Sequence, residues 1–415
     1  MNKQFLSILE TYMHDKPYSF PEDFDQVQQL YRFSVEHKMA AAVYEQIQGS
    51  ALWQKEEYAP LMAKWKRHTI TDVMLQVQRE EGFLTVYKRF LLAGVKPLVV
   101  KGIICRHLYS KPDHRISSDE DILIRREEFP VCDEILLAEG FKREELSIEG
   151  GVEALPWEIP YRNLATGTYI ELHFDLFEPG EGFFGAMNDS FSKVFDSCIC
   201  QNIKGVDIWT LSATDHMLYL ICHAFKHFIH GGFGVRQICD MVMLSEKYGD
   251  SINWNLIKEN LIRFRMDSFW AGLAEIGRVY LGFDWEKAFY YVSLQEAYVG
   301  MDDLLEDLLD SGIYGSRSME RKHSANITLS AAVRGRKRMA ASMKGSLFPG
   351  KEYMKKKYSW VEHFPILLPI GYCVRVVEYL GERKRHKSYS GKEEKSGLKI
   401  GMERVKLLRK YRIIE

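Results

Sequence analysis

The segment SSDEDILI, residues 117–124, places two aspartates, Asp119 and Asp121, at the start of an apolar run. If this run is a strand, side chains two positions apart face the same way with Cα atoms roughly 6–7 Å apart, and Glu120 points to the other face. Two converging carboxylates suit Mg²⁺, which takes oxygen ligands and retains water or substrate phosphate. Without a cation, burying both charges costs several kcal/mol or forces one acid to protonate. The alternative is a solvated strand end.

A third acid, Glu171, lies in YIELHFD, residues 169–175, where polar residues occupy one face of a predicted strand. Acids from two neighbouring strands form a cradle for two-metal phosphoryl or nucleotidyl transfer, with metals about 3.5–4 Å apart. One acid can also accept the proton of an attacking hydroxyl. In the alternative, His173 accepts the proton or binds the metal, and Glu171 forms an ion pair with a lysine on the sheet edge.

A Lys-Gly pair, Lys101 and Gly102, ends the short apolar run before the acidic segment. Glycine lets the backbone approach a phosphate, and a following helix start offers free N–H groups to an anion. Lys101 would add a positive charge. The same pair is also consistent with an ordinary turn.

The elements that position these residues follow from changes of hydrophobic period. Helical spacing dominates the first ninety residues, and Gly94 is a good left-handed cap for a helix over Thr69–Ala93. Strands separated by helices then predict an α/β unit. The predicted strands are 97–100, 119–124 and 169–176, and the predicted helices are 103–109, 127–138, 216–228, 236–248 and 256–280.

This reading predicts four regions along the chain. They are a helical N-terminal region at 1–93, an α/β core at 94–205, a helical domain at 206–345, and a C-terminal segment with a basic tail at 346–415. The stretch Ser316–Pro349 is basic and contains glycines near its end, and it is interpreted as a linker or a mobile loop.

The composition excludes several classes of protein. The chain has 415 residues, is 46% apolar and carries a net charge of −1, which argues against disorder and low complexity. No apolar run approaches the roughly 18 residues of a membrane helix, and the N-terminus lacks a signal-peptide pattern, so we expect a cytoplasmic protein without a membrane span. The seven scattered cysteines argue against disulfides and structural zinc. Cys198 and Cys200 are interpreted as buried thiols on one strand face.

The last 33 residues, 383–415, hold twelve Lys or Arg against four Glu. Such a tail binds nucleic acid or anionic lipid in some proteins and is a solvated helix in others. We favour the solvated helix, because Tyr389 and Tyr411 are the only aromatic residues among these charges.

Taken together, several motifs resemble the uncharacterised bacterial nucleotidyltransferase family of the polymerase-beta-like nucleotidyltransferase superfamily. The resemblance covers about residues 90–380. It rests on Leu98-Val99-Val100-Lys101-Gly102, Leu108-Tyr109, Pro112, Arg115, Asp119-x-Asp121-Ile122-Leu123-Ile124, Glu171-Leu172-His173, His223-Ala224-Phe225-Lys226-His227, Gly231-Gly232, Arg236, Asp240, Leu347-Phe348-Pro349 and Tyr353.

The resemblance implies an α/β (α+β) nucleotidyltransferase core with a mixed β-sheet and helical flanks. It also implies that Asp119, Asp121 and Glu171 are catalytic and hold Mg²⁺ or Mn²⁺. The superfamily usually has Gly-Ser or Gly-Gly at the first turn, about a dozen residues before its two aspartates. Here Lys101-Gly102-Ile103 stands instead, and Asp119 follows Gly102 by seventeen positions. This departure would let Lys101 or Arg115 replace contacts usually made by a hydroxyl.

The helical half offers further cations. His223 and His227 are four apart, a spacing compatible with zinc, but the glutamate of a zinc-protease motif is missing. We therefore expect Lys226 or His227 to reach the triphosphate, and we add Gly102 and Ser118 to the nucleotide-binding residues. Arg236 and Asp240, also four apart, are interpreted as an ion pair on one helix face.

The predicted function is transfer of a nucleoside monophosphate from a nucleoside triphosphate to an acceptor hydroxyl or phosphate, with release of pyrophosphate. One alternative is a catalytically weak nucleotide-binding or partner-binding protein that keeps the fold. Another is a transferase that modifies nucleic acid through its basic tail. The acceptor, the preferred base and the oligomeric state stay open.

Overall fold

The computed structural model describes residues 2–143, 155–180, 183–284, 297–312 and 397–414, together with 328, 354, 368–372 and 374. The chain divides into two compact units, residues 1–226 with 233–313, and residues 227–232 with 314–415. Cys373, the motif at 347–349, Tyr353 and the first part of the basic tail lie outside the described residues, as does almost all of Ser316–Pro349.

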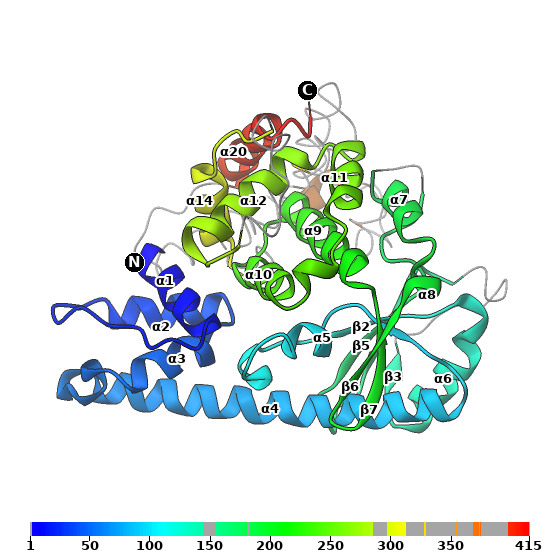
Figure 1. Cartoon of the computed structure of the whole chain (residues 1–415), viewed down its shortest axis with the longest axis horizontal. Coiled ribbons are helices and arrows are strands. Elements are labelled where there is room, and N and C mark those ends of the chain that lie inside the picture. Colours follow the sequence, from blue (N-terminus) through cyan, green and yellow to red (C-terminus); the bar gives the residue numbers. More distant parts are fainter. Residues whose placement is uncertain are drawn as a thin grey trace. The chain divides into compact units, whose positions relative to one another are not determined.

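Helices fill the N-terminal part of the first unit, as predicted (Figure 1). They are α1 (Asn2–Met13), α2 (Val27–Glu36), α3 (Ala40–Gln48) and the 34-residue α4 (Ala59–Leu92), with two short 3₁₀ turns, Ala51–Gln54 and Glu56–Tyr58. The helix predicted over Thr69–Ala93 begins ten residues earlier, and Gly94 follows it with a φ of +81°, as expected of a left-handed cap.

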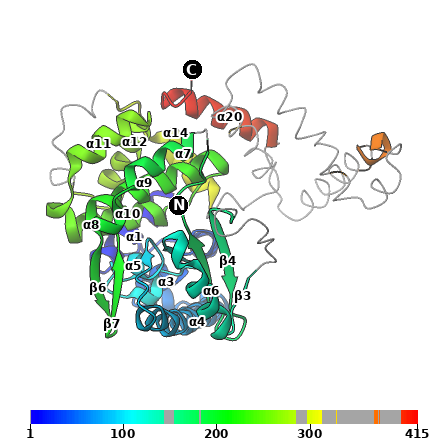
Figure 2. The same cartoon turned by 90° about the vertical axis from the view of Figure 1, so that its right-hand side faces the viewer.

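A seven-stranded mixed sheet follows, in the order β3-β4-β5-β2-β1-β7-β6. Figure 2 shows β3 and β4 at one edge and β6 and β7 at the other. β2 runs parallel to β5 and antiparallel to β1, and β1 runs parallel to β7. The strands are β1 (Leu98–Val99), β2 (Glu120–Leu123), β3 (Lys142–Arg143), β4 (Glu158–Arg162), β5 (Tyr169–His173), β6 (Ile199–Ile203) and β7 (Val206–Thr210).

One face of the sheet packs on α4 and on α6 (Phe129–Ala138), and side chains of both helices join one hydrophobic core with the strands. Ile122 of β2 and both Ile170 and Leu172 of β5 belong to this core. Because strand side chains alternate, Asp121 and Glu171 lie on the opposite face. The mixed sheet with helical flanks that the resemblance implied is confirmed.

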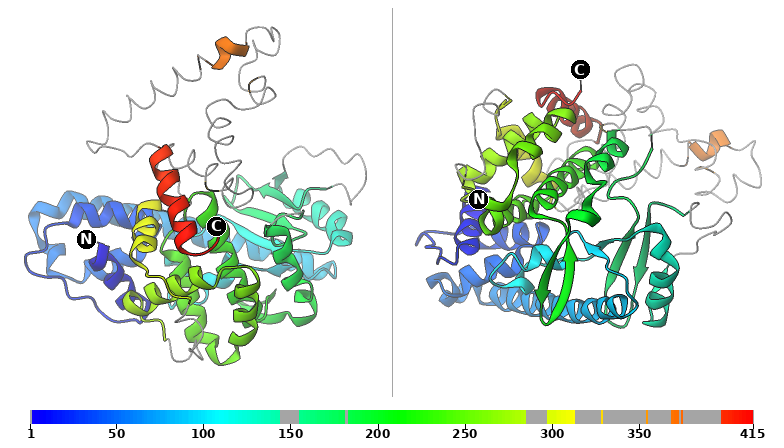
Figure 3. Two further views of the ribbon diagram at one scale, coloured as in Figure 1. Left: turned by 90° about the horizontal axis from the view of Figure 1, so that it is seen from above. Right: turned by 45° about the vertical axis from the view of Figure 1, so that its right-hand side comes forward.

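Further helices follow the strands along the chain. They are α9 (Ala213–His230), whose last four residues belong to the second unit, α10 (Arg236–Tyr248), α11 (Trp254–Arg263), α12 (Asp267–Tyr280) and α14 (Asp302–Ser311). Shorter elements connect them to the strands: α5 (Ile103–Arg106), α7 (Phe183–Asn188), α8 (Val194–Ser197), and 3₁₀ turns at Pro112–His114, Arg126–Glu128, Asp189–Phe191 and Gly249–Ser251. In Figure 3 the N-terminal helices, in blue, lie beside the yellow α14, where the buried His37 bonds the carbonyl of Leu309.

Two local predictions were wrong. The single helix predicted over Leu256–Tyr280 is broken between α11 and α12, where Arg265 adopts a left-handed φ of +53° without a glycine or proline to signal it. Cys198 and Cys200 are not buried thiols: Cys198 is half-buried and Cys200, on the edge strand β6, is exposed.

In the second unit, the described part of the tail forms α20 (Gly397–Lys410). Its buried Arg404 donates to the carbonyl of Phe228, and Thr328 donates to the carbonyl of Ile229. Among the described helices of the chain, none has the length and apolar character that would span a membrane.

Candidate active site

Asp121 and Glu171 occupy paired positions on the neighbouring parallel strands β2 and β5. Asp121 is 4% exposed, whereas the Glu171 side chain is 30% exposed. The two side chains therefore lie side by side on one face of the sheet, with Asp121 buried and Glu171 partly accessible. The sequence predicted this convergence of acids from two strands, and the register produces it.

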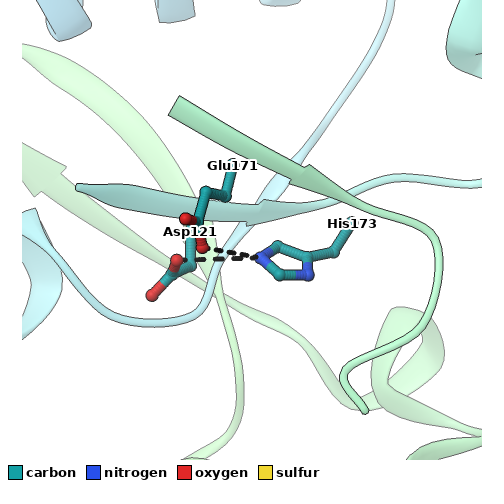
Figure 4. A group of neighbouring side chains, drawn as sticks. All are labelled: Asp121, Glu171 and His173. Atoms are coloured by element: carbon teal, nitrogen blue, oxygen red, sulfur yellow. Dashed lines mark ion pairs between the residues drawn. The ribbon is translucent and has the colours of Figure 1, made fainter. Parts of the chain in front are cut away.

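His173 completes the cluster from the end of β5. Its Nε2 lies 3.7 Å from Asp121 Oδ1 and 3.8 Å from Glu171 Oε2. Dashed lines mark these two ion pairs in Figure 4. Its Nδ1 lies 3.8 Å from Glu158 Oε2. One ligand atom each from Asp121, Glu171 and His173 falls within 4.8 Å of the other two, which suits a metal ion. The sequence analysis named His173 only as an alternative to Glu171.

The two facing acids have opposite pKa shifts. Burial tends to raise the pKa of Asp121, but His173 and the positive charge of Lys101 outweigh it and hold that pKa well below its usual range. Burial, followed by the negative charges of Asp121 and Asp119, raises the pKa of Glu171 to about 8. Near neutral pH the pair therefore holds one proton, and a divalent cation would compensate both charges in its place.

Asp119 lies immediately before β2 and is half-buried. Its negative charge acts on Glu171 and on Glu120, which places it at the same end of the strands as the pair. It contributes no atom to the compact group formed by Asp121, Glu171 and His173.

Lys101 and Gly102 precede the acidic strand in the sequence, and each makes a different contact. Lys101 is buried, and its Nζ is 3.2 Å from Nε2 of His223 on α9. Gly102 has a φ of +48°, and a Cβ there would lie 2.7 Å from Cδ of Glu120. The backbone N–H of Ile103, expected to be free for an anion, donates instead to Glu120 Oε2 at 2.7 Å.

Glu120 points to the opposite face, as predicted, and joins a buried ion network. Arg106 Nη1 lies 2.5 Å from Glu120 Oε1, and Arg106 Nε lies 3.1 Å from Glu80 Oε2 on α4. Arg106 also donates to the hydroxyl of Ser117. This network fixes the Gly102 turn and the start of β2 against α4.

Arg115 is brought to Asp240 and not into the acid cluster. Its Nε and Nη2 donate to the two Asp240 oxygens at 2.8 and 2.6 Å, and the Tyr109 hydroxyl donates to Oδ1 at 2.9 Å. Both partners of the ion pair are buried. The predicted Arg236–Asp240 pair was therefore wrong: Arg236 donates to the carbonyl of Ile116.

Ser118 is exposed and accepts a hydrogen bond of 2.5 Å from Lys38 Nζ, in the turn between α2 and α3. Sequence reasoning missed Lys38, because no motif surrounds it and eighty residues separate it from its partner. Burial, followed by the positive charge of Arg236, lowers the pKa of Lys38 to about 8.

Lys226 lies over the ring of Trp157, with Nζ 4.7 Å from the centroid. The Trp157 ring is in turn 5.4 Å from the His173 ring. Lys226 thus reaches the surroundings of the cluster through an aromatic side chain that the sequence analysis did not select. His227, the next residue of α9, belongs to the second unit.

A mixed sheet that joins acids from two neighbouring strands beside a buried lysine has the features expected of a nucleotidyltransferase. The comparison with protein families agrees: the model described as "Uncharacterised nucleotidyltransferase" matches residues 24–280. The chain therefore belongs to this uncharacterised nucleotidyltransferase family, which confirms the family named in the resemblance but says nothing of a bacterial origin. Comparisons with curated proteins and with solved structures gave no match. Membership supports nucleotidyl transfer as the general reaction.

Proposed function

We propose that the protein transfers a nucleoside monophosphate from a nucleoside triphosphate to an acceptor hydroxyl or phosphate, with Mg²⁺ or Mn²⁺ as cofactor. The observation that carries this proposal is the pairing of Asp121 with Glu171, whose opposite pKa shifts leave a negative site suited to a cation. Asp119, at the same strand ends, completes the proposed set of metal-binding acids.

The reaction balances without a further reactant. The acceptor oxygen bonds to the α-phosphorus, the bond from that phosphorus to the bridging oxygen breaks, and pyrophosphate leaves. When bound, the cation supplies charge stabilisation at the phosphate oxygens and holds the attacking and leaving groups in line.

The chain's own residues would supply the remaining steps. Asp121 and Glu171 would hold the cation, and one acid of the site would take the proton of the attacking hydroxyl. Lys101 stands close enough to influence Asp121 and would neutralise phosphate charge. Among the other nucleotide-binding candidates, Gly102 and Ser118 flank the acids, Lys226 lies beyond Trp157, and Arg115 supports the loop before β2 through Asp240.

Nucleoside triphosphates labelled at the α- or the γ-phosphate test this proposal. Transfer sends the γ-label into pyrophosphate and leaves the α-label on the acceptor, as its bound nucleoside monophosphate. Asp121→Asn and Glu171→Gln should each reduce pyrophosphate release roughly 100-fold or more. Glu134→Gln, an exposed acid on α6, is the matched control and should retain full activity.

Two results would contradict the proposal. Recovery of the γ-label as orthophosphate would indicate phosphate hydrolysis, not nucleotidyl transfer. Nucleotide binding without pyrophosphate release, across a panel of sugar, protein and RNA acceptors, would favour the catalytically weak binding protein.

A further inference from the structure

His173 is a buried histidine whose ring nitrogens face acids on both sides. Its Nε2 lies 3.7 Å from Asp121 Oδ1 and 3.8 Å from Glu171 Oε2, and its Nδ1 lies 3.8 Å from Glu158 Oε2. The side chain is 7% exposed, and within the described part of the chain neither ring nitrogen has a hydrogen-bond partner. A buried polar group in this state is unusual and points to a bound water or ion.

The distances from Nε2 are too long for hydrogen bonds and suit a shared ion. Hydrogen bonds from nitrogen to oxygen span about 2.7–3.2 Å. Two atoms that each bind one cation at roughly 2.1 Å are at most roughly 4.2 Å apart. Both Nε2 distances lie between these limits, so His173 can share a cation with either acid. In Figure 4 the imidazole of His173 points toward Asp121 and Glu171.

Strand β4 holds the His173 ring from the other side. Glu158 pairs with His173 in the antiparallel register of β4 and β5, which sets its carboxylate beside Nδ1. The Trp157 ring packs on the imidazole with centroids 5.4 Å apart, and the N–H of Phe174 donates to the carbonyl of Trp157 at 2.9 Å. Histidines that bind a metal usually direct their second ring nitrogen to a carboxylate, which leaves the first nitrogen free for the ion. Glu158 has the position for this role.

The group differs from a site built of three acids. Asp119 contributes no atom to it, and His173 supplies the third ligand atom beside Asp121 and Glu171. Oxygen ligands alone suit Mg²⁺, whereas imidazole nitrogen suits transition-metal ions. The identity of the third ligand therefore bears on which cation the protein selects.

We propose that His173, oriented by Glu158, is a nitrogen ligand of the cation and makes the site prefer Mn²⁺ to Mg²⁺. The inference rests on the proposed function, whose acids Asp121 and Glu171 supply the oxygen ligands. Mn²⁺ takes carboxylate oxygen as Mg²⁺ does, but it belongs to the first-row ions that also bind nitrogen. His173 thus acts as a specificity-determining residue for the metal, and Glu158 acts as a positioning residue.

Calorimetry of the full chain with Mn²⁺ alone and with Mg²⁺ alone tests the preference. Wild-type protein should bind Mn²⁺ about tenfold more tightly than Mg²⁺, or better. His173→Gln offers an amide oxygen in place of the nitrogen. Its affinity for Mn²⁺ should fall about tenfold or more, while its affinity for Mg²⁺ changes less than about threefold. Thermal unfolding in a chelator confirms that the variant is folded.

Pulsed electron paramagnetic resonance detects the ligand directly. Mn²⁺ on wild-type protein should show hyperfine coupling to an imidazole nitrogen, and His173→Gln should lose it. Glu158→Gln should weaken Mn²⁺ binding about tenfold but keep the coupling, because Glu158 acts through His173. His14→Gln is the matched control, since His14 also lies between two acids, Glu10 and Glu246, but outside this group. It should change neither measurement.

Several results would overturn the inference. They are absence of Mn²⁺ binding, equal wild-type affinity for the two ions, absence of nitrogen coupling in the wild-type protein, and persistence of the coupling in folded His173→Gln.

The ligand role and the proposed function fail separately. Wild-type protein that releases pyrophosphate from nucleoside triphosphates, but shows no nitrogen coupling to Mn²⁺, disproves the ligand role alone. Wild-type protein that binds Mn²⁺ through His173 without any nucleotidyl transfer supports the ligand role and disproves the proposed reaction.

Discussion

Asp121 and Glu171 lie directly across from one another on parallel strands, and one of them favours the charged form while the other favours the protonated form. Two facing carboxylates of like charge separate their pKa values in this way when no cation compensates them. The pair therefore makes cation binding, proton binding and folding stability depend on one another.

Removal of Glu171 should stabilise the metal-free protein at high pH. The folded pKa of about 8 exceeds the unfolded value, so the wild-type free energy of unfolding falls as pH rises from about 4.5 through 8. Glu171→Gln removes that fall. Its free energy of unfolding should therefore exceed the wild-type value by an amount that grows from pH 6 to pH 8.5. Urea unfolding in a chelator measures this difference. Glu134→Gln should show no such trend. If Glu171→Gln differed from wild type by the same free energy of unfolding at every pH, the raised pKa of Glu171 would be contradicted.

Mg²⁺ or Mn²⁺ should stabilise the wild-type protein against heat. A cation present at one hundred times its dissociation constant adds about 2.7 kcal/mol to the free energy of unfolding, because it binds only the folded state. Differential scanning fluorimetry with and without the metal measures the shift. Asp121→Asn should abolish it, whereas Glu134→Gln should retain it. Equal shifts in all three proteins would place the metal elsewhere.

Gly102→Ala should destabilise the fold by roughly 2–4 kcal/mol. A Cβ at this position overlaps the buried Glu120 carboxylate, which is itself held by Arg106 and cannot move away. Gly205→Ala is the control, because Gly205 also has a positive φ but nothing lies within 4 Å of its added Cβ. That variant should lose only about 1–2 kcal/mol of stability, because its left-handed backbone conformation is unfavourable for alanine. Chemical denaturation compares the two.

Asp240→Asn should cost about 3–5 kcal/mol of stability, because it leaves the buried Arg115 guanidinium without its counter-charge. The exposed Asp250→Asn, close behind α10, should change stability by less than about 0.5 kcal/mol. Urea denaturation of both variants measures the difference. A small effect for Asp240→Asn would mean that Arg115 finds another partner.

Local sequence pattern was enough to predict several parts of the site. The D-x-D spacing put Asp121 on one face of β2 and Glu120 on the other, because alternation depends only on strand geometry. Gly94 likewise ends α4 as its left-handed preference requires. Strand alternation and the family motif together indicated Glu171, and the register of β2 and β5 sets it opposite Asp121.

Contacts between distant segments could not be predicted in this way. Arg236 and Asp240 fit the helical i, i+4 rule, but burial of Arg115 against Asp240 outweighs that local preference. β7 was not predicted as a strand, and Cys200 is exposed because β6, with which β7 pairs, is an edge strand of the sheet. Lys38 meets Ser118 only through the tertiary fold.

The 34-residue helix α4 also limits how this chain can exchange segments with other proteins during evolution. Near its start Trp65 is buried and donates to the carbonyl of Ala40 in α3, and near its end Tyr87 bonds the carbonyl of Pro97 just before β1. A recombination event that replaced the chain before residue 94 would remove α4. The apolar face of the sheet would then be uncovered, and Arg106 would lose its partner Glu80. We therefore expect α4 and the acid-bearing strands to be inherited together.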